Sequence, residues 1–170
     1  MLFEKFGEFD SVDELNRAAA AQKAEGDEEA LKKLAEENGI DAEDAEDYMD
    51  DCTESLATPL MAAMGKIKVE AVELEINGIL DDWKDSVTLM CINSEQMQIA
   101  VRRKGKSLRD CMAALIKFAF ENKVQVSDKI VKATKVLQNG KLVGMRSPLY
   151  LGIPNMAQAE KIIREYYLGK

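Results

Sequence analysis

The sequence predicts a mainly α protein: a helical-bundle core preceded by a small acidic three-helix module, with room for one short β-hairpin. Apolar residues recur at helical spacing over most of the 170 residues, and helix-starting and helix-ending residues separate these stretches. Charge is also segregated along the chain. Residues 1–85 hold 25 Asp/Glu and 8 Lys/Arg, a net charge of −17, whereas residues 86–170 hold 6 Asp/Glu and 15 Lys/Arg, a net charge of +9.

The first 54 residues predict the acidic module, three short helices joined by tight turns. A Ser-x-x-Glu capping box starts a helix over residues 12–24. The second helix lies between its cap at Asp27 and a left-handed stop at Asn38-Gly39, and Asp41 caps the third. The apolar stripes of these helices are narrow. We therefore expect the module to dock on the rest of the chain or to need a partner for full order.

Residues 58–170 predict the helical core domain, with a basic surface. Thr58-Pro59 starts a long helix that extends to about Leu89, although the alternation of apolar and acidic residues over 69–76 leaves a strand as the alternative. The remaining predicted elements are a short helix over 94–103, an apolar central helix that begins at Ser107, a short helix over 130–135, an Asn-Gly hairpin over 137–143, and a last helix with Pro154 in its first turn and Gly169 at its end.

Composition narrows the classes of function. No apolar run approaches the roughly 20 residues that cross a bilayer, and residues 1–5 lack a secretory apolar stretch, so we expect a cytoplasmic protein without a membrane partner. Cys52, Cys91 and Cys111 lack metal-ligand spacing and predict buried free thiols without a metal site. The chain has no histidine, the commonest general base. We expect a binding protein that is not an enzyme and has no cofactor.

The predicted third helix carries a dense group of carboxylates. A solvated helix face explains the group, but because like charges one turn apart destabilise a helix, the group also fits a phosphate-like surface for a basic protein groove. Calcium fits less well, since the twelve-residue loop with its central glycine is missing. The residues are Asp41, Glu43, Asp44, Glu46, Asp47, Asp50 and Asp51.

Five cations precede the predicted central helix: Arg102, Arg103, Lys104, Lys106 and Arg109. Clusters of this kind attract phosphate backbones and make nucleic acid a second candidate partner. The cluster contains no aromatic residue, so a solvated loop, or pairing with the acidic half, is an equal alternative. The sequence has neither a phosphate-binding Gly-rich loop nor a Gly-x-Ser-x-Gly motif.

Several short motifs lie in the second half of the chain. They are Lys106-Ser107-Leu108-Arg109-Asp110-Cys111, the apolar helix Met112–Phe120, and Val126-Ser127-Asp128-Lys129-Ile130. These stretches resemble the PcfK-like proteins of mobile elements in gut and related Firmicutes. Tyr150-Leu151-Gly152-Ile153-Pro154, with residues 159–167, resembles phage or integrative-element proteins of such bacteria. The resemblance covers about residues 100–168.

The PcfK-like grouping includes anti-CRISPR proteins, which inhibit type II RNA-guided CRISPR nucleases. The resemblance therefore implies stoichiometric inhibition of such a nuclease, or of its guide complex, in a bacterial host cell. Two routes stay open: the acidic residues occupy a basic groove of the nuclease, which we prefer, or the basic half holds nucleic acid or the guide complex. The alternative function is a nucleic-acid-binding accessory protein of a phage or conjugative element. These patterns do not fix the oligomeric state.

Overall fold

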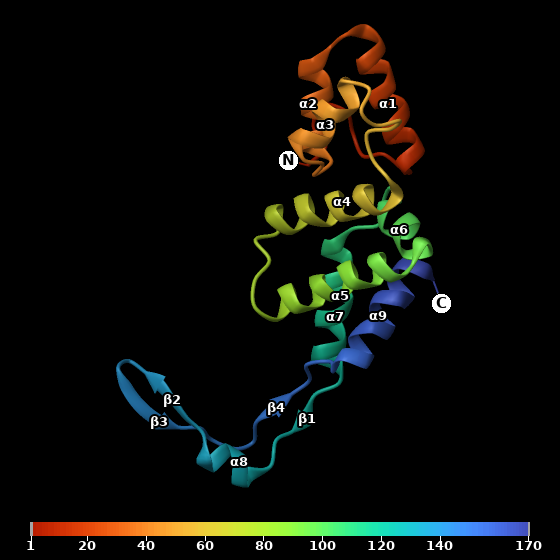
Figure 1. Cartoon of the computed structure of the whole chain (residues 1–170). Helices are drawn as coiled ribbons and strands as arrows, with labels where there is room; N and C mark the ends of the chain where they lie inside the picture. The colour runs from red at the N-terminus through yellow and green to blue at the C-terminus, as the bar shows by residue number, and fades with distance from the viewer. Residues whose placement is uncertain (1, 170) are drawn as a thin grey trace.

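A computed structural model describes residues 2–169 and confirms the mainly α prediction (Figure 1). Three regions follow one another along the length of the molecule. The acidic module contains α1 to α3, the helical body contains α4 to α7 and α9, and the arm comprises residues 123–153. Figure 1 shows the module at one end, the body in the middle, and the arm projecting from the opposite end of the body.

The three helices of the acidic module form where the sequence predicts them, although the Asp41 side chain makes no cap hydrogen bond at the start of α3. They are α1 (Val12–Glu25), α2 (Glu28–Glu37) and α3 (Ala42–Met49). The Ser11 hydroxyl accepts the first-turn N–H of Glu14 at 3.2 Å, and left-handed Gly26 ends α1. Their narrow apolar stripes converge on one cluster, which is sealed by residues of the following segment and of α4; its members include Leu15, Ala19, Leu31, Leu34, Ile40, Tyr48, Leu56, Ala57 and Ala62.

The helical body has a separate and larger core. Its helices are α4 (Pro59–Glu73), α5 (Ile79–Asn93), α6 (Glu95–Arg102), α7 (Leu108–Glu121) and α9 (Met156–Leu168). The core cluster includes Ile67, Trp83, Val87, Cys91, Met97, Val101, Leu108, Cys111, Leu115, Ile163 and Tyr167. The first half of α7 is buried in this cluster, whereas Phe120 near its end is 67 % exposed. The end of α7 therefore marks the edge of the body.

The prediction of one long helix from residue 58 to about 89 is wrong. The chain instead forms α4 and α5, which pack against each other and are joined by residues 74–78. Glu75 and Gly78 in this loop adopt positive φ values of 50° and 60°, which lie outside the helical region. The alternative strand over 69–76 is also absent, because α4 continues to Glu73.

The final helix starts after Pro154, which was predicted to lie in its first turn. Pro154 lies before α9 rather than in its first turn, and Asn155 is the N-cap. The Asn155 side chain accepts the backbone N–H of Gln158 at 2.9 Å, while the Gln158 side chain accepts the N–H of Asn155 at 3.0 Å. This reciprocal capping box fixes the start of the helix. Gly169 ends it in a left-handed conformation, as predicted.

The arm contains two short antiparallel pairs and one helical turn. In chain order its elements are β1 (Val124–Gln125), α8 (Asp128–Ala133), β2 (Lys135–Gln138), β3 (Lys141–Gly144) and β4 (Tyr150–Leu151). The pair β2–β3 confirms the predicted Asn-Gly hairpin, since Asn139 and Gly140 both have positive φ, as a tight hairpin turn requires. The β1–β4 pair, which closes the root of the arm, was not predicted from the sequence.

Glycines permit two close backbone contacts that position these regions. At the boundary of the module and the body, a Cβ on Gly65 of α4 would lie 2.1 Å from the Asn38 carbonyl oxygen. At the root of the arm, a Cβ on Gly152 would lie 1.9 Å from the Ala119 carbonyl oxygen of α7. Any larger residue would push the backbones apart at either point.

Candidate partner-binding surfaces

The acidic residues of α3 and its ends lie on the outer side of the module. Ala45 and Tyr48 face the module core, so the helix turns its carboxylates to solvent. All seven predicted acidic residues are exposed except Asp44, which is partly buried. The structure therefore keeps the predicted acidic group together on one surface of the module, which we call the α3 acidic surface.

Lysines neutralise three members of the α3 acidic surface. Asp41 pairs with Lys68 of α4 at 2.7 Å, and Asp51 pairs with Lys23 of α1 at 2.6 Å. The Lys23 ammonium also lies 4.5 Å from the centre of the Tyr48 ring and donates to the Tyr48 carbonyl. These contacts attach both ends of α3 to neighbouring helices.

Glu46 is the third paired carboxylate and lies 3.2 Å from the Lys32 ammonium. The other four carboxylates, Glu43, Asp44, Asp47 and Asp50, form no ion pair or hydrogen bond with any side chain among residues 2–169. Three of them, Glu43, Asp47 and Asp50, follow the i, i+4, i+7 spacing of one helix stripe. The result is an uncompensated negative stripe on a helix held at both ends.

The basic cluster before α7 is not one surface, because its first member points inward. Arg102 is 2 % exposed and donates through Nη2 to the Asn38 side-chain oxygen at 2.8 Å. Its guanidinium lies about 6 Å from the rings of Phe3 and Phe9, and burial lowers its pKa from the ordinary value. A phosphate cannot reach this side chain. The assignment of Arg102 to a nucleic-acid surface is therefore wrong.

The other four cations of the cluster differ in their surroundings. Arg103 and Lys104 are exposed, and the Lys104 backbone N–H donates to Asp10 at 3.0 Å. Lys106 donates to the Tyr166 carbonyl at 2.6 Å and covers the Tyr166 ring. Arg109 pairs with Asp110 at 2.9 Å. Only part of the predicted basic cluster therefore remains open to a partner.

A buried polar network joins the module to the body, and the sequence analysis did not identify it. Lys66 of α4 is 1 % exposed; its ammonium donates to Glu8 at 2.6 Å and to the Arg103 carbonyl at 2.9 Å. Glu70, one turn later, accepts the Leu108 N–H at 2.6 Å, and burial raises its pKa. The i, i+4 spacing of Lys66 and Glu70 is visible in the sequence, but the contact with Glu8 depends on the fold.

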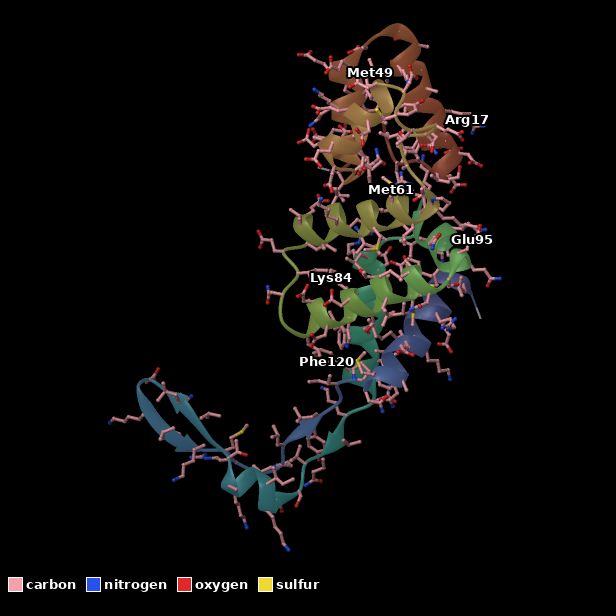
Figure 2. The ribbon with its side chains drawn as sticks, viewed as in Figure 1. Arg17, Met49, Met61, Lys84, Glu95 and Phe120 are labelled. Atoms are coloured by element: carbon pink, nitrogen blue, oxygen red, sulfur yellow. The ribbon has the colours of Figure 1, made fainter. Side chains whose placement is uncertain are left out.

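The second set of side chains that the sequence analysis missed lies on the arm. Beyond Lys123 at its root, the arm carries five exposed cations that form no ion pair within the described part of the chain: Lys129, Lys132, Lys135, Lys141 and Arg146. Figure 2 labels Phe120 at the junction between the body and the arm. The sequence could have indicated these cations, because residues 123–153 contain six Lys/Arg and one Asp.

Comparison of the chain with protein-family models, curated proteins and solved structures returned no match. Within residues 2–169, no group of three His, Cys, Asp or Glu side chains is placed to hold a metal ion. No helix in that part combines the length and apolar character needed to cross a bilayer. The α3 acidic surface and the cations of the arm are thus the two charged surfaces from which we infer a function.

Proposed function

We propose that this chain is an anti-CRISPR protein that binds and stoichiometrically inhibits a type II RNA-guided CRISPR nuclease in a bacterial host cell. The sequence resemblance of residues 100–168 to PcfK-like proteins supports the class of partner. The observation that carries the proposal is the unpaired stripe Glu43, Asp47 and Asp50 on a helix attached at both ends. A rigid row of carboxylates can replace nucleic-acid phosphates in a basic groove without first being ordered.

The charge around the stripe strengthens this proposal. Residues 1–54 hold 19 Asp/Glu and 5 Lys/Arg, a net charge of −14. A field of this size accelerates association with a positively charged groove and weakens steeply with salt. The module core and the contacts of Lys23 and Lys68 hold α3 in place, so the binding energy is not reduced by ordering the helix.

A nuclease cleavage assay with a five-residue amide variant tests the proposal. The variant replaces Glu43, Asp44, Glu46, Asp47 and Asp50 by Gln or Asn. We expect the wild type to inhibit at about one molecule per nuclease, and the variant to need at least about tenfold more protein at low salt. The matched control makes the same number of Glu→Gln changes on exposed sites of the body, at Glu73, Glu75, Glu95, Glu121 and Glu160.

The control variant should inhibit like the wild type, since it loses the same net charge outside the module. Equal inhibition by the amide variant and the wild type would reject the acidic surface as the contact. Absence of inhibition by the wild type, across type II nucleases with their guides, would reject the function itself. The helical content of both variants, followed by circular dichroism, should equal that of the wild type because none of the replaced side chains is buried.

The second candidate function is a nucleic-acid-binding accessory protein of a phage or conjugative element. The burial of Arg102 and the pairing of Arg109 weaken the basic cluster on which the sequence analysis based it. The unpaired cations of the arm now favour this function instead. The two functions are compatible in one chain, because their surfaces lie at opposite ends of the molecule (Figure 1).

A further inference from the structure

The arm makes almost no contribution to either hydrophobic core. Among residues 123–153, Val131 alone is buried, and it belongs to neither core cluster. Figure 1 shows the β2–β3 hairpin at the far end of the arm, well away from the helices of the body. Folding stability of the body thus does not account for the hairpin, which points to a role in binding.

The charge of the arm is opposite to that of the rest of the molecule. Residues 123–153 hold six Lys/Arg and one Asp, a net charge of +5, whereas the remaining residues hold 17 Lys/Arg and 30 Asp/Glu, a net charge of −13. All six cations are exposed and form no ion pair in the described structure, and Lys123 at the root also lies over the Phe120 ring. The negative module therefore does not neutralise the arm.

The hairpin also has the shape and side-chain order of a groove-binding ribbon. A two-stranded β-ribbon fits the major groove of B-form DNA. Leu137 and Leu142 are opposite each other in the β2–β3 register, so they share one face, and they are 73 % and 70 % exposed. Lys135, two residues before Leu137, lies on this face, and Lys141, next to Leu142, lies on the opposite face of the ribbon. Apolar side chains flanked by cations suit contacts with bases and phosphates, respectively.

Charge favours a nucleic-acid partner over symmetric pairing of the arm with the arm of a second copy. Symmetric pairing of two arms would bring two net charges of +5 together, which is unfavourable. A DNA duplex instead offers one negative charge for about every 1.7 Å of its axis and releases counterions when cations bind. The arm cations are distributed over α8, β2, β3 and the segment after β3, so several of them can reach phosphates along a duplex.

We propose that the arm is a binding site for double-stranded DNA. Lys129, Lys132, Lys135, Lys141 and Arg146 contact phosphates, and the β2–β3 hairpin enters a groove with Leu137 and Leu142 toward the bases. This site is separate from the α3 acidic surface and does not depend on nuclease inhibition. Binding at the arm would place the acidic module at the far end of the molecule, away from the duplex.

The test measures binding of the full chain to a short fluorescent DNA duplex by anisotropy over a salt series. The arm variant replaces the five arm cations beyond Lys123 by Gln. The control variant replaces five exposed cations outside both the arm and the basic cluster by Gln, at Arg17, Lys68, Lys117, Lys161 and Arg164. We expect the arm variant to lose at least about tenfold in affinity at low salt, with a log–log salt slope shallower by up to about 4, and the control to stay close to wild type.

A third variant, Leu137→Ser with Leu142→Ser, separates the groove contact from charge. It should bind more weakly than wild type with an unchanged salt slope, because no phosphate contact is removed. Equal weakening by the arm and control variants would overturn the site, as would wild-type binding that single-stranded DNA of the same length matches. Self-association that the arm variant abolishes, without DNA binding by the wild type, would assign the arm to a second copy and also overturn the proposal.

Discussion

The acidic module and the arm are both strongly charged appendages of the body, but they are attached in opposite ways. The module is fixed by the Gly39–Gly65 contact, by Lys66 and by the Arg102–Asn38 hydrogen bond. The arm is fixed only at its root, where Gly152 lies against α7. The comparison shows that one chain can hold a charged surface rigidly at one end and present another on a projecting ribbon at the other.

The two attachments have different consequences for binding. A preorganised surface loses little conformational entropy when it meets a partner, so the α3 acidic surface suits a fixed groove. A ribbon with few tertiary contacts can adjust its direction to a partner, but it must be ordered on binding. Substitutions at the module boundary should therefore affect stability more than changes in the arm.

Loss of Lys66 should have the largest effect on stability. Lys66→Met leaves Glu8, the buried Glu70 and the Arg103 carbonyl without their cationic partner, and we expect a loss of about 3 kcal/mol in the free energy of unfolding. Lys68→Met on the same helix is the control. Its exposed pair with Asp41 should contribute no more than about 1 kcal/mol. If Lys66→Met and Lys68→Met lowered the free energy of unfolding in urea equally, the buried network would not stabilise the contact between module and body.

Gly65→Ala should reduce stability, although alanine is the better helix former. The new Cβ would lie 2.1 Å from the Asn38 carbonyl oxygen, so α4 and the end of α2 must separate. We expect a loss of about 2 kcal/mol, typical of overpacking. Gly144→Ala in the arm is the control, because no atom lies within 4 Å of its Cβ position. If Gly65→Ala left the urea midpoint of unfolding unchanged, the close contact between Gly65 of α4 and the Asn38 carbonyl would be contradicted.

Shortening the arm should barely change stability. The β1–β4 pair brings Gln125 opposite Tyr150, so an Asn-Gly turn can replace residues 126–149. Because Val131 is the one buried residue in the removed stretch, we expect the free energy of unfolding to change by less than about 1 kcal/mol. A larger loss in thermal or urea unfolding would mean that the arm supports the body.

Thiol labelling measures the difference in exposure between the cysteine of the module and the two cysteines of the body. Cys52, just after α3, is exposed, whereas Cys91 and Cys111 lie in the core of the body. Burial raises the pKa of each of the latter two thiols to about 12, so neither forms a reactive thiolate near neutral pH. We expect iodoacetamide at pH 8 to label one cysteine in the folded protein and all three after unfolding, as counted by mass spectrometry.

Local signals in the sequence predicted much of the fold but not the contacts between its regions. Caps such as Ser11, Asp27 and Ser107 interact only with nearby backbone, so they placed the helices correctly. The break at 74–78 was missed because apolar spacing continues across it, although the chain folds back there to place α5 against α4. The β1–β4 pair was missed because its two strands are short and far apart in sequence.

For the predicted sites too, local sequence patterns located residues on one helix but did not predict contacts between distant segments. The acidic residues of α3 are neighbours in sequence and remain together in space, since one amphipathic helix carries most of them. The cations from Arg102 to Arg109 are also neighbours, but the helix end and the following loop point them in different directions. Burial of Arg102 depends on Asn38, 64 residues away, which no local pattern encodes. Cys52 was likewise predicted to be buried and is exposed, because it lies beyond the end of α3.

Hydrogen–deuterium exchange of the free full-length protein tests the central claim most directly. A rigidly docked module and a weakly attached arm predict that peptides from α2, α4 and α6 exchange slowly and together, whereas β2–β3 peptides exchange orders of magnitude faster through local opening. Equal protection of the β2–β3 hairpin and α4 would contradict the account, as would module peptides that exchange as fast as those of the arm.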